Sequence, residues 1–138
     1  MTSMYPAPPV TADSRPYWAF LRDGEWRMQS CSGCATLRFP PGGVCRACGS
    51  TSFTWEPVPS TGTVIARTIV HRAPNADFAD RVPYVLAIVE LIPGVRLVAP
   101  VTGTGVEVGD RVALSREAAA DGYQLPVFIP ADPDRSLE

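Results

Sequence analysis

All four cysteines of this 138-residue chain lie in one short stretch, as Cys31, Cys34, Cys45 and Cys48. They form two Cys-x-x-Cys pairs separated by ten residues. Each pair suits a tight turn that points two sulfurs at one ion, and two such turns complete a tetrahedral four-thiolate site of the kind that holds zinc. Because four thiolates fill the coordination shell, no position stays open for water or substrate. The spacing therefore predicts structural zinc.

Three other uses of these cysteines stay open at this stage. Iron in a site of the rubredoxin type takes similar ligands, two disulfides would form in an oxidising compartment, and a redox enzyme uses a Cys-x-x-Cys pair. Nothing in the sequence indicates an oxidising compartment, and a redox motif would occur once rather than twice. Zinc is the preferred interpretation.

The remaining residues predict no catalytic site. The only histidine, His71, stands beside Arg72 at the end of a predicted strand, and no Gly-x-Ser-x-Gly or other nucleophile motif is present. The segment 103–109, GTGVEVG, has the wrong glycine spacing for a dinucleotide loop and leads into a strand. We expect His71 to pack or to bind a ligand at the rim of a barrel, and GTGVEVG to form a turn.

The elements around the cysteines suit a small N-terminal module. Residues 13–24 predict one short helix, because Pro16 falls in its first turn, Tyr17 and Leu21 have helical spacing, and Gly24 ends it. Residues 25–31 and 49–58 have strand-like composition and flank the cysteines. The aromatic side chains of this module either form a small core or dock a partner, and the candidates for docking are Tyr17, Trp18 and Trp26.

Beyond Trp55 the sequence predicts a barrel. Five short β-branched segments, 61–72, 84–91, 95–102, 111–116 and 124–129, are separated by Gly, Pro and Asp. Their number and spacing favour an OB-fold, with an SH3-like barrel as the nearest rival. Residues 116–122, REAAADG, end in a hairpin signal and predict a turn. The predicted fold class is mainly β, with an N-terminal helix, a rubredoxin-like zinc ribbon and a C-terminal five-stranded OB-fold barrel.

Length and charge set the remaining limits. We divide the chain into a flexible tail over 1–12, the helix and ribbon over 13–56, the barrel over 57–130 and a C-terminal tail over 131–138. The net charge is −2, and neither a membrane helix nor a signal peptide is evident, so we expect a cytoplasmic protein that binds no membrane. The alternative function, from another functional class, is a nucleic-acid-binding OB module. Such a module needs a basic groove with aromatic side chains on which bases stack, whereas the predicted barrel has six arginines, seven acids and few aromatics.

The chain resembles the zinc-ribbon/OB-fold proteins known as domain of unknown function 35, an acyl-CoA-associated family. The resemblance extends from about Arg15 to Pro130 and includes YWAFLRDG, CSGCATLRFPPGGVCRACGS, TIVHRAP, PYVLAIVEL and LPVFIP. One departure is Ala35, where the first knuckle often has glycine, so the turn is expected to be strained.

The resemblance implies a non-catalytic accessory subunit of an acyl-CoA-processing enzyme in lipid metabolism. Its partner would be a thiolase-fold enzyme that forms or cleaves carbon–carbon bonds, such as a thiolase, aldolase or acyltransferase, with a hot-dog-fold enoyl-CoA hydratase as the alternative. The acyl-CoA would bind at a shared site. The long loop 71–84 is the candidate contact, because it offers arginines for phosphate and apolar groups for the pantetheine arm, in His71, Arg72, Phe78, Arg81 and Tyr84.

Overall fold

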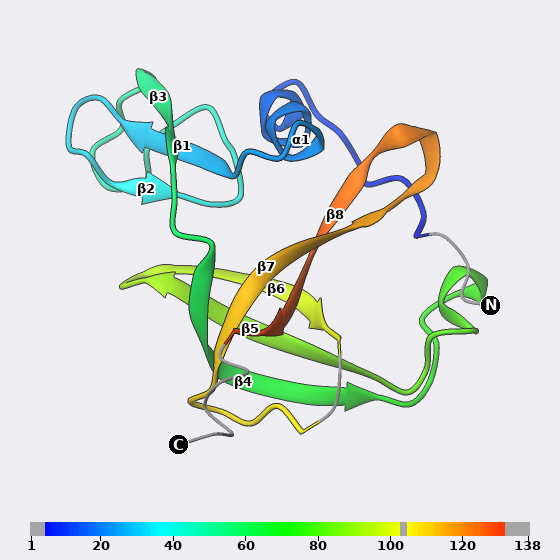
Figure 1. The fold of residues 1–138 in the computed structure, drawn as a ribbon. Helices are drawn as coiled ribbons and strands as arrows, with labels where there is room; N and C mark the ends of the chain where they lie inside the picture. Colours follow the sequence, from blue (N-terminus) through cyan, green and yellow to red (C-terminus); the bar gives the residue numbers. More distant parts are fainter. Residues whose placement is uncertain (1–4, 103–104, 132–138) are drawn as a thin grey trace.

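The structure is a computed structural model that describes residues 5–102 and 105–131. A helix and a three-stranded sheet lie beside a closed barrel formed by the later part of the chain (Figure 1). Within the described ranges, no helix combines the length and apolar character needed to cross a membrane. Of the two tails expected from the sequence, residues 1–4 and 132–138 lie outside the described residues.

The helix α1 (Arg15–Arg22) is shorter than the predicted segment 13–24 but lies within it. Pro16 falls in its first turn, where a missing backbone N–H removes no hydrogen bond. Tyr17 and Leu21, four residues apart, share a face and are each 1% exposed. Gly24 adopts φ +88°, a conformation that favours glycine, and ends the helix.

The ribbon sheet contains β1 (Arg27–Cys31), β2 (Leu37–Arg38) and β3 (Phe53–Pro57). The central strand β1 pairs antiparallel with β2 on one side and with β3 on the other. The two Cys-x-x-Cys turns follow β1 and precede β3, so the sheet brings both turns to the same end of the ribbon.

The barrel contains β4 (Thr61–Val70), β5 (Tyr84–Ile92), β6 (Val95–Val101), β7 (Arg111–Ala118) and β8 (Gln124–Pro130), in the closed order β4-β5-β6-β8-β7. Strand β6 pairs parallel with β8, and the other pairs are antiparallel. This is the OB-fold predicted from the sequence, not the SH3-like alternative. Two short 3-10 helices, η1 (Ala76–Phe78) and η2 (Ala120–Gly122), lie in the connections. Part of the predicted turn 116–122 continues strand β7, and the chain reverses after Ala118.

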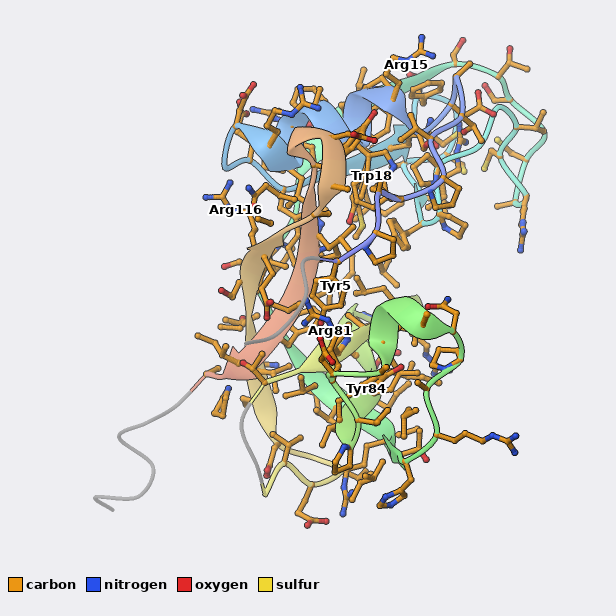
Figure 2. The ribbon with its side chains drawn as sticks, turned by 90° about the vertical axis from the view of Figure 1, so that its right-hand side faces the viewer. Tyr5, Arg15, Trp18, Arg81, Tyr84 and Arg116 are labelled. Atoms are coloured by element: carbon orange, nitrogen blue, oxygen red, sulfur yellow. The ribbon has the colours of Figure 1, made fainter. Side chains whose placement is uncertain are left out.

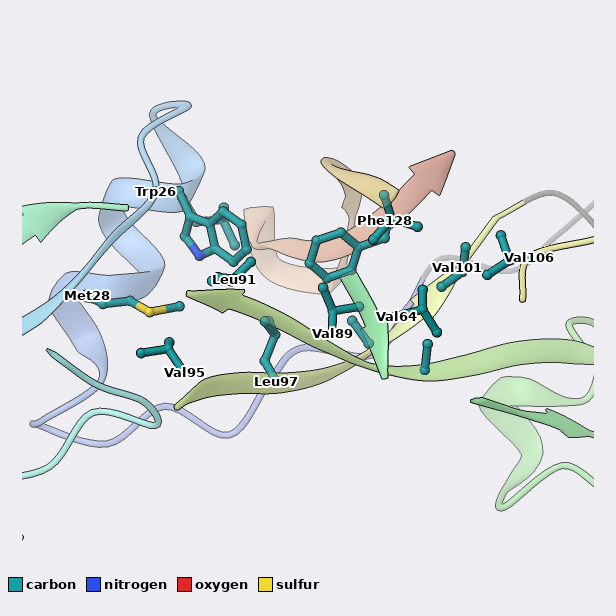
Figure 3. Close-up of a cluster of buried hydrophobic side chains, with 14 of the residues drawn as sticks. Trp26, Met28, Val64, Val89, Leu91, Val95, Leu97, Val101, Val106 and Phe128 are labelled. Carbon is teal, nitrogen blue, oxygen red and sulfur yellow. The ribbon is translucent and has the colours of Figure 1, made fainter. Parts of the chain in front are cut away.

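One hydrophobic core joins the barrel to the N-terminal module. Along β6 the side chains alternate, so that Val95, Leu97, Ala99 and Val101 are buried while their neighbours are exposed or half-buried. Trp26 and Met28 of the module belong to the same cluster as these barrel residues (Figure 3). The ribbon and the barrel therefore share buried apolar surface.

Tyr5, within the segment 1–12 that we expect to be a flexible tail, contacts the barrel. Tyr5 is 6% exposed and forms a parallel β-bridge with Ala119, just beyond β7. The backbone N–H of Ala120 donates to the carbonyl of Tyr5 at 2.9 Å. An isolated aromatic among prolines gave no periodic pattern from which this contact could be predicted.

Candidate metal centre and ligand cleft

The four cysteine sulfurs converge on one point. All four Sγ atoms lie within 4.8 Å of one another, with Cys31 and Cys48 separated by 3.5 Å and Cys34 and Cys45 by 3.7 Å. Zinc at the centre of a tetrahedron, about 2.3 Å from each sulfur, requires sulfurs about 3.8 Å apart. The residues present therefore fit a four-coordinate zinc ion.

The two turns that hold the sulfurs have the same backbone design. In the first turn the N–H of Ala35 donates to the carbonyl of Cys31, and in the second the N–H of Gly49 donates to that of Cys45, both at 2.8 Å. The residue after each second cysteine has a positive φ, +62° at Ala35 and +79° at Gly49. Ala35 therefore occupies the left-handed conformation that its Cβ disfavours. This is the strained turn expected where alanine replaces the usual glycine.

Backbone N–H groups stabilise thiolate at the first knuckle. The N–H of Gly33 donates to Cys31 Sγ at 3.3 Å, and the N–H groups of Cys34 and Gly33 lower the pKa of Cys31 to about 6. A thiolate is the form that ligates a metal. Cys31 and Cys45 are buried and Cys34 and Cys48 exposed, so the centre lies at the surface of the ribbon. With all four positions taken by sulfur, the zinc has a structural role.

A buried glutamine supports the hairpin between the knuckles. Gln29 is 0% exposed, and its side-chain oxygen accepts hydrogen bonds from Arg38 Nε at 2.7 Å and from the Gly42 N–H at 2.9 Å. Arg38 also donates to the carbonyl of Gly42 at 2.9 Å. Reasoning from sequence missed Gln29, because a polar residue in a strand is ordinarily assigned to the exposed face.

A cleft of about 540 Å³ lies at one end of the barrel, beside the loop 71–84. Arg81 and Tyr84 line it together with Tyr5 (Figure 2), and Phe78 packs against the rings of both tyrosines. The Phe78 ring centroid is 6.0 Å from those of both Tyr5 and Tyr84. Apolar and charged side chains both line the cleft, among them Ile69, Val85, Val101, Val106, Arg67, Asp80, Arg81, Glu107 and Glu117.

Arg81 is more enclosed than the sequence suggested. Only 10% of its side chain is exposed, its Nη1 lies 3.7 Å from a carboxylate oxygen of Glu117, and its guanidinium carbon lies 3.5 Å from the Tyr5 ring centroid. A side chain on a long loop is ordinarily exposed. The difference arises because the loop folds back through η1 and meets the N-terminal segment, which is remote in sequence.

His71 and Arg72 lie apart from that cluster. Both are exposed, immediately after β4, and neither is among the residues that line the cleft. The structure therefore brings together three of the five residues predicted for ligand contact and leaves these two on the surface.

The aromatic residues expected to dock a partner are mostly buried. Tyr17 is 1% and Trp26 7% exposed, and Trp26 packs against Phe128 with ring centroids 6.0 Å apart. Burial raises the pKa of Tyr17 to about 12. Both side chains belong to the core, so the docking assignment is wrong for them. Trp18 is half-buried, with its ring between those of Tyr17 and Tyr123.

Two family models match consecutive parts of the chain. The ChsH2 rubredoxin-like zinc ribbon domain matches residues 18–54, and the ChsH2 C-terminal OB-fold domain matches residues 55–116. The first match contains all four cysteines and the second begins at Trp55. Zinc, inferred above from spacing and sulfur geometry, agrees with the ribbon model.

Similar proteins come from bacteria and archaea. A probable enoyl-CoA hydratase alpha subunit of Thermomonospora curvata is 36% identical over 136 residues, which are 95% of this chain and 41% of that protein. A DUF35 domain-containing scaffold protein of Methanocaldococcus jannaschii is 38% identical over 49% of this chain and 48% of its own length. The chain thus spans less than half of each of these relatives.

Solved structures share the fold. A chain of the Ltp2-ChsH2(DUF35) aldolase superposes with a TM-score of 0.81 and 34% identity, covering 91% of this chain and 99% of that one. A DUF35 protein of unknown function from Sulfolobus solfataricus, at 15% identity and a TM-score of 0.60, has the same fold. With the four-thiolate ribbon and the OB barrel, these matches show that the chain belongs to the ChsH2/DUF35 family.

Proposed function

We propose that this chain is a non-catalytic accessory subunit, or domain, of an acyl-CoA-processing enzyme. Its partner is a thiolase-fold enzyme that forms or cleaves a carbon–carbon bond, as an aldolase does. The chain stabilises that enzyme and contributes part of the wall of its acyl-CoA site. The observation that carries the proposal is the 34% identity to a ChsH2(DUF35) chain of an aldolase complex, which extends over nearly the whole of both chains.

The chemistry of the described residues supports an accessory role. All four thiols meet at the metal centre, so none is left to act as a nucleophile. The histidine is exposed and lies outside the cleft. Activity of the complex is therefore assigned to the partner.

A hydratase is the second candidate partner. The Thermomonospora curvata relative bears the name of an enoyl-CoA hydratase alpha subunit, and its similarity to this chain covers 95% of the chain. Both candidate partners act on acyl-CoA thioesters, so the ligand chemistry at the shared site is the same. The identity of the partner is what separates them.

The cleft at the end of the barrel is the part of the chain that we assign to the coenzyme. Coenzyme A combines phosphates with a long apolar arm, and the cleft combines arginines with apolar side chains. We also assign Arg72, exposed two residues beyond β4 and outside the cleft, to a phosphate of the coenzyme. Its guanidinium can donate two charge-assisted hydrogen bonds to one phosphate group.

The ligand assignment is tested in the native complex with Arg72→Gln. We expect the affinity for coenzyme A, measured by calorimetry, to fall about tenfold, since a hydrogen bond to a charged group is lost. Arg46→Gln, at an arginine of the ribbon that is also exposed, is the matched control and should bind normally. Equal affinity of both variants for coenzyme A would contradict the assignment of the coenzyme to this end of the barrel.

The partner and the division of labour are tested separately. The chain is purified from its source with whatever accompanies it, and each companion is identified by mass spectrometry. An aldolase or thiolase-type subunit supports the first candidate and a hydratase the second. The isolated chain should turn over no acyl-CoA ester, and turnover that disappears in His71→Ala would show that the chain itself is the enzyme.

A further inference from the structure

Among residues 5–12, the described residues of the N-terminal segment, the backbone contact with the barrel is made by Tyr5. Tyr5 forms one isolated β-bridge, with Ala119, and its carbonyl accepts one hydrogen bond, from the N–H of Ala120. A local contact of this kind can open at a lower free energy than the global unfolding of a core. Tyr5 is the one buried residue among residues 5–12, so its side chain anchors this segment.

That side chain covers Arg81, one of the arginines that line the cleft. The Tyr5 ring lies 3.5 Å from the guanidinium carbon of Arg81 and packs edge-on against Phe78. Glu117 approaches Arg81 at 3.7 Å. Tyr5 also lines the cleft, so the same ring closes part of its wall and holds Arg81 against the barrel (Figure 2).

We propose that the N-terminal segment is a releasable strap, and that Tyr5 withholds Arg81 from anionic ligands until the strap detaches. The inference rests on the proposed function in one respect only, that the anion is a phosphate of coenzyme A. With Tyr5 docked, the ring covers one face of the Arg81 guanidinium, and the guanidinium forms an ion pair with Glu117. Release of Tyr5 uncovers that face and widens the cleft.

The covering of Arg81 is tested with an arginine-specific reagent. In the wild-type chain, phenylglyoxal should modify Arg81 more slowly than the exposed Arg72, with both rates followed by peptide mass spectrometry. Tyr5→Ala should raise the rate at Arg81 about tenfold, because the ring contact is lost, and leave Arg72 unchanged. Tyr5→Phe keeps the ring but loses the hydroxyl that hydrogen-bonds with Arg81, so its rate at Arg81 should lie closer to that of the wild type than to that of Tyr5→Ala. Equal rates at Arg81 in all three proteins would overturn the strap.

A second measurement needs no substitution and detects release in the wild-type chain. The N–H of Ala120 is bonded to Tyr5, whereas the neighbouring N–H of Ala119 is bonded to Tyr123 within the hairpin, at 2.7 Å. If the strap detaches while the hairpin stays closed, hydrogen exchange at Ala120 should be about tenfold faster than at Ala119. Equal exchange of the two amides would show a permanently docked segment and would also overturn the proposal.

Titration with coenzyme A distinguishes failure of the strap from failure of the proposed function. Tyr5→Ala should bind coenzyme A about fivefold more tightly than the wild type, and Arg81→Gln in the same background should abolish the gain. If phenylglyoxal reaches Arg81 in Tyr5→Ala but coenzyme affinity does not change, the strap stands and the coenzyme assignment fails. If Arg81 stays protected, the strap fails whatever the coenzyme affinity.

Discussion

In the ribbon, strand β2 has two residues, and Cys45 is the only buried residue between Ser32 and Pro57. In the barrel, every strand contributes at least one buried apolar side chain, for example Val64, Val89, Leu97, Val112 and Phe128. The barrel closes on itself and packs its interior, whereas the buried residues of the ribbon strands and knuckles are confined to β1 and Cys45. A region this small needs another source of stability.

The metal centre supplies that stability. Four thiolates on one zinc ion tie together two turns that are eleven residues apart between Cys34 and Cys45. Because such a site does not exist in the unfolded chain, the free energy of metal binding contributes to folding. Similar short strands are thus stabilised by metal coordination in the ribbon and by burial of apolar side chains in the barrel.

The largest expected effect is at the metal. Cys34→Ser should lose zinc and unfold the ribbon, because structural zinc contributes on the order of 10 kcal/mol, while the barrel keeps its own strands. Cys45→Ser should do the same. Metal analysis, calorimetry and backbone NMR measure the two regions separately. Ser32→Ala, an exposed neighbour, serves as control, and a cysteine variant that lost metal yet melted like the wild type would contradict the comparison.

A smaller effect is expected from crowding the barrel. At Gly62 an added Cβ would lie 2.6 Å from a methyl group of Val89 and 2.7 Å from the carbonyl oxygen of Glu90. Gly62→Ala should therefore reduce the free energy of unfolding by about 1–3 kcal/mol without loss of zinc. Gly42→Ala in the ribbon, where the Cβ would meet nothing within 4 Å, should be nearly neutral. Denaturant unfolding of both variants checks this, and equal stabilities would refute the packing argument.

The smallest effect compares the two knuckles. Ala35→Gly should stabilise the zinc-loaded chain by about 0.5 kcal/mol, because relief of the left-handed strain outweighs the added flexibility of glycine in the unfolded chain. Gly49→Ala, the equivalent position of the second knuckle, should destabilise it by a similar amount. Unfolding in denaturant at fixed free zinc measures both. A less stable Ala35→Gly variant would mean that the turn gains more from the methyl group than it loses in strain.

Much of this fold could be predicted before the structure. The five barrel strands begin at the predicted residues, and their ends differ from the predicted ones by no more than about two residues. Strand formation depends here on alternating β-branched residues bounded by Gly, Pro and Asp. These signals lie within a few residues of one another, so the sequence alone predicts the strands. The metal site could also be predicted from the sequence, because two closely spaced Cys-x-x-Cys turns can direct all four sulfurs at one ion.

The contacts around Tyr5, Arg81 and Trp26 could not be predicted in this way. Trp26 lies in the core shared with the barrel. Tyr5 covers Arg81, although the two residues are far apart in the sequence. Nothing near Arg81 in sequence distinguishes it from the exposed Arg72. Local periodicity and turn chemistry depend on neighbours within a few residues, whereas burial depends on which distant segments the closed barrel brings alongside.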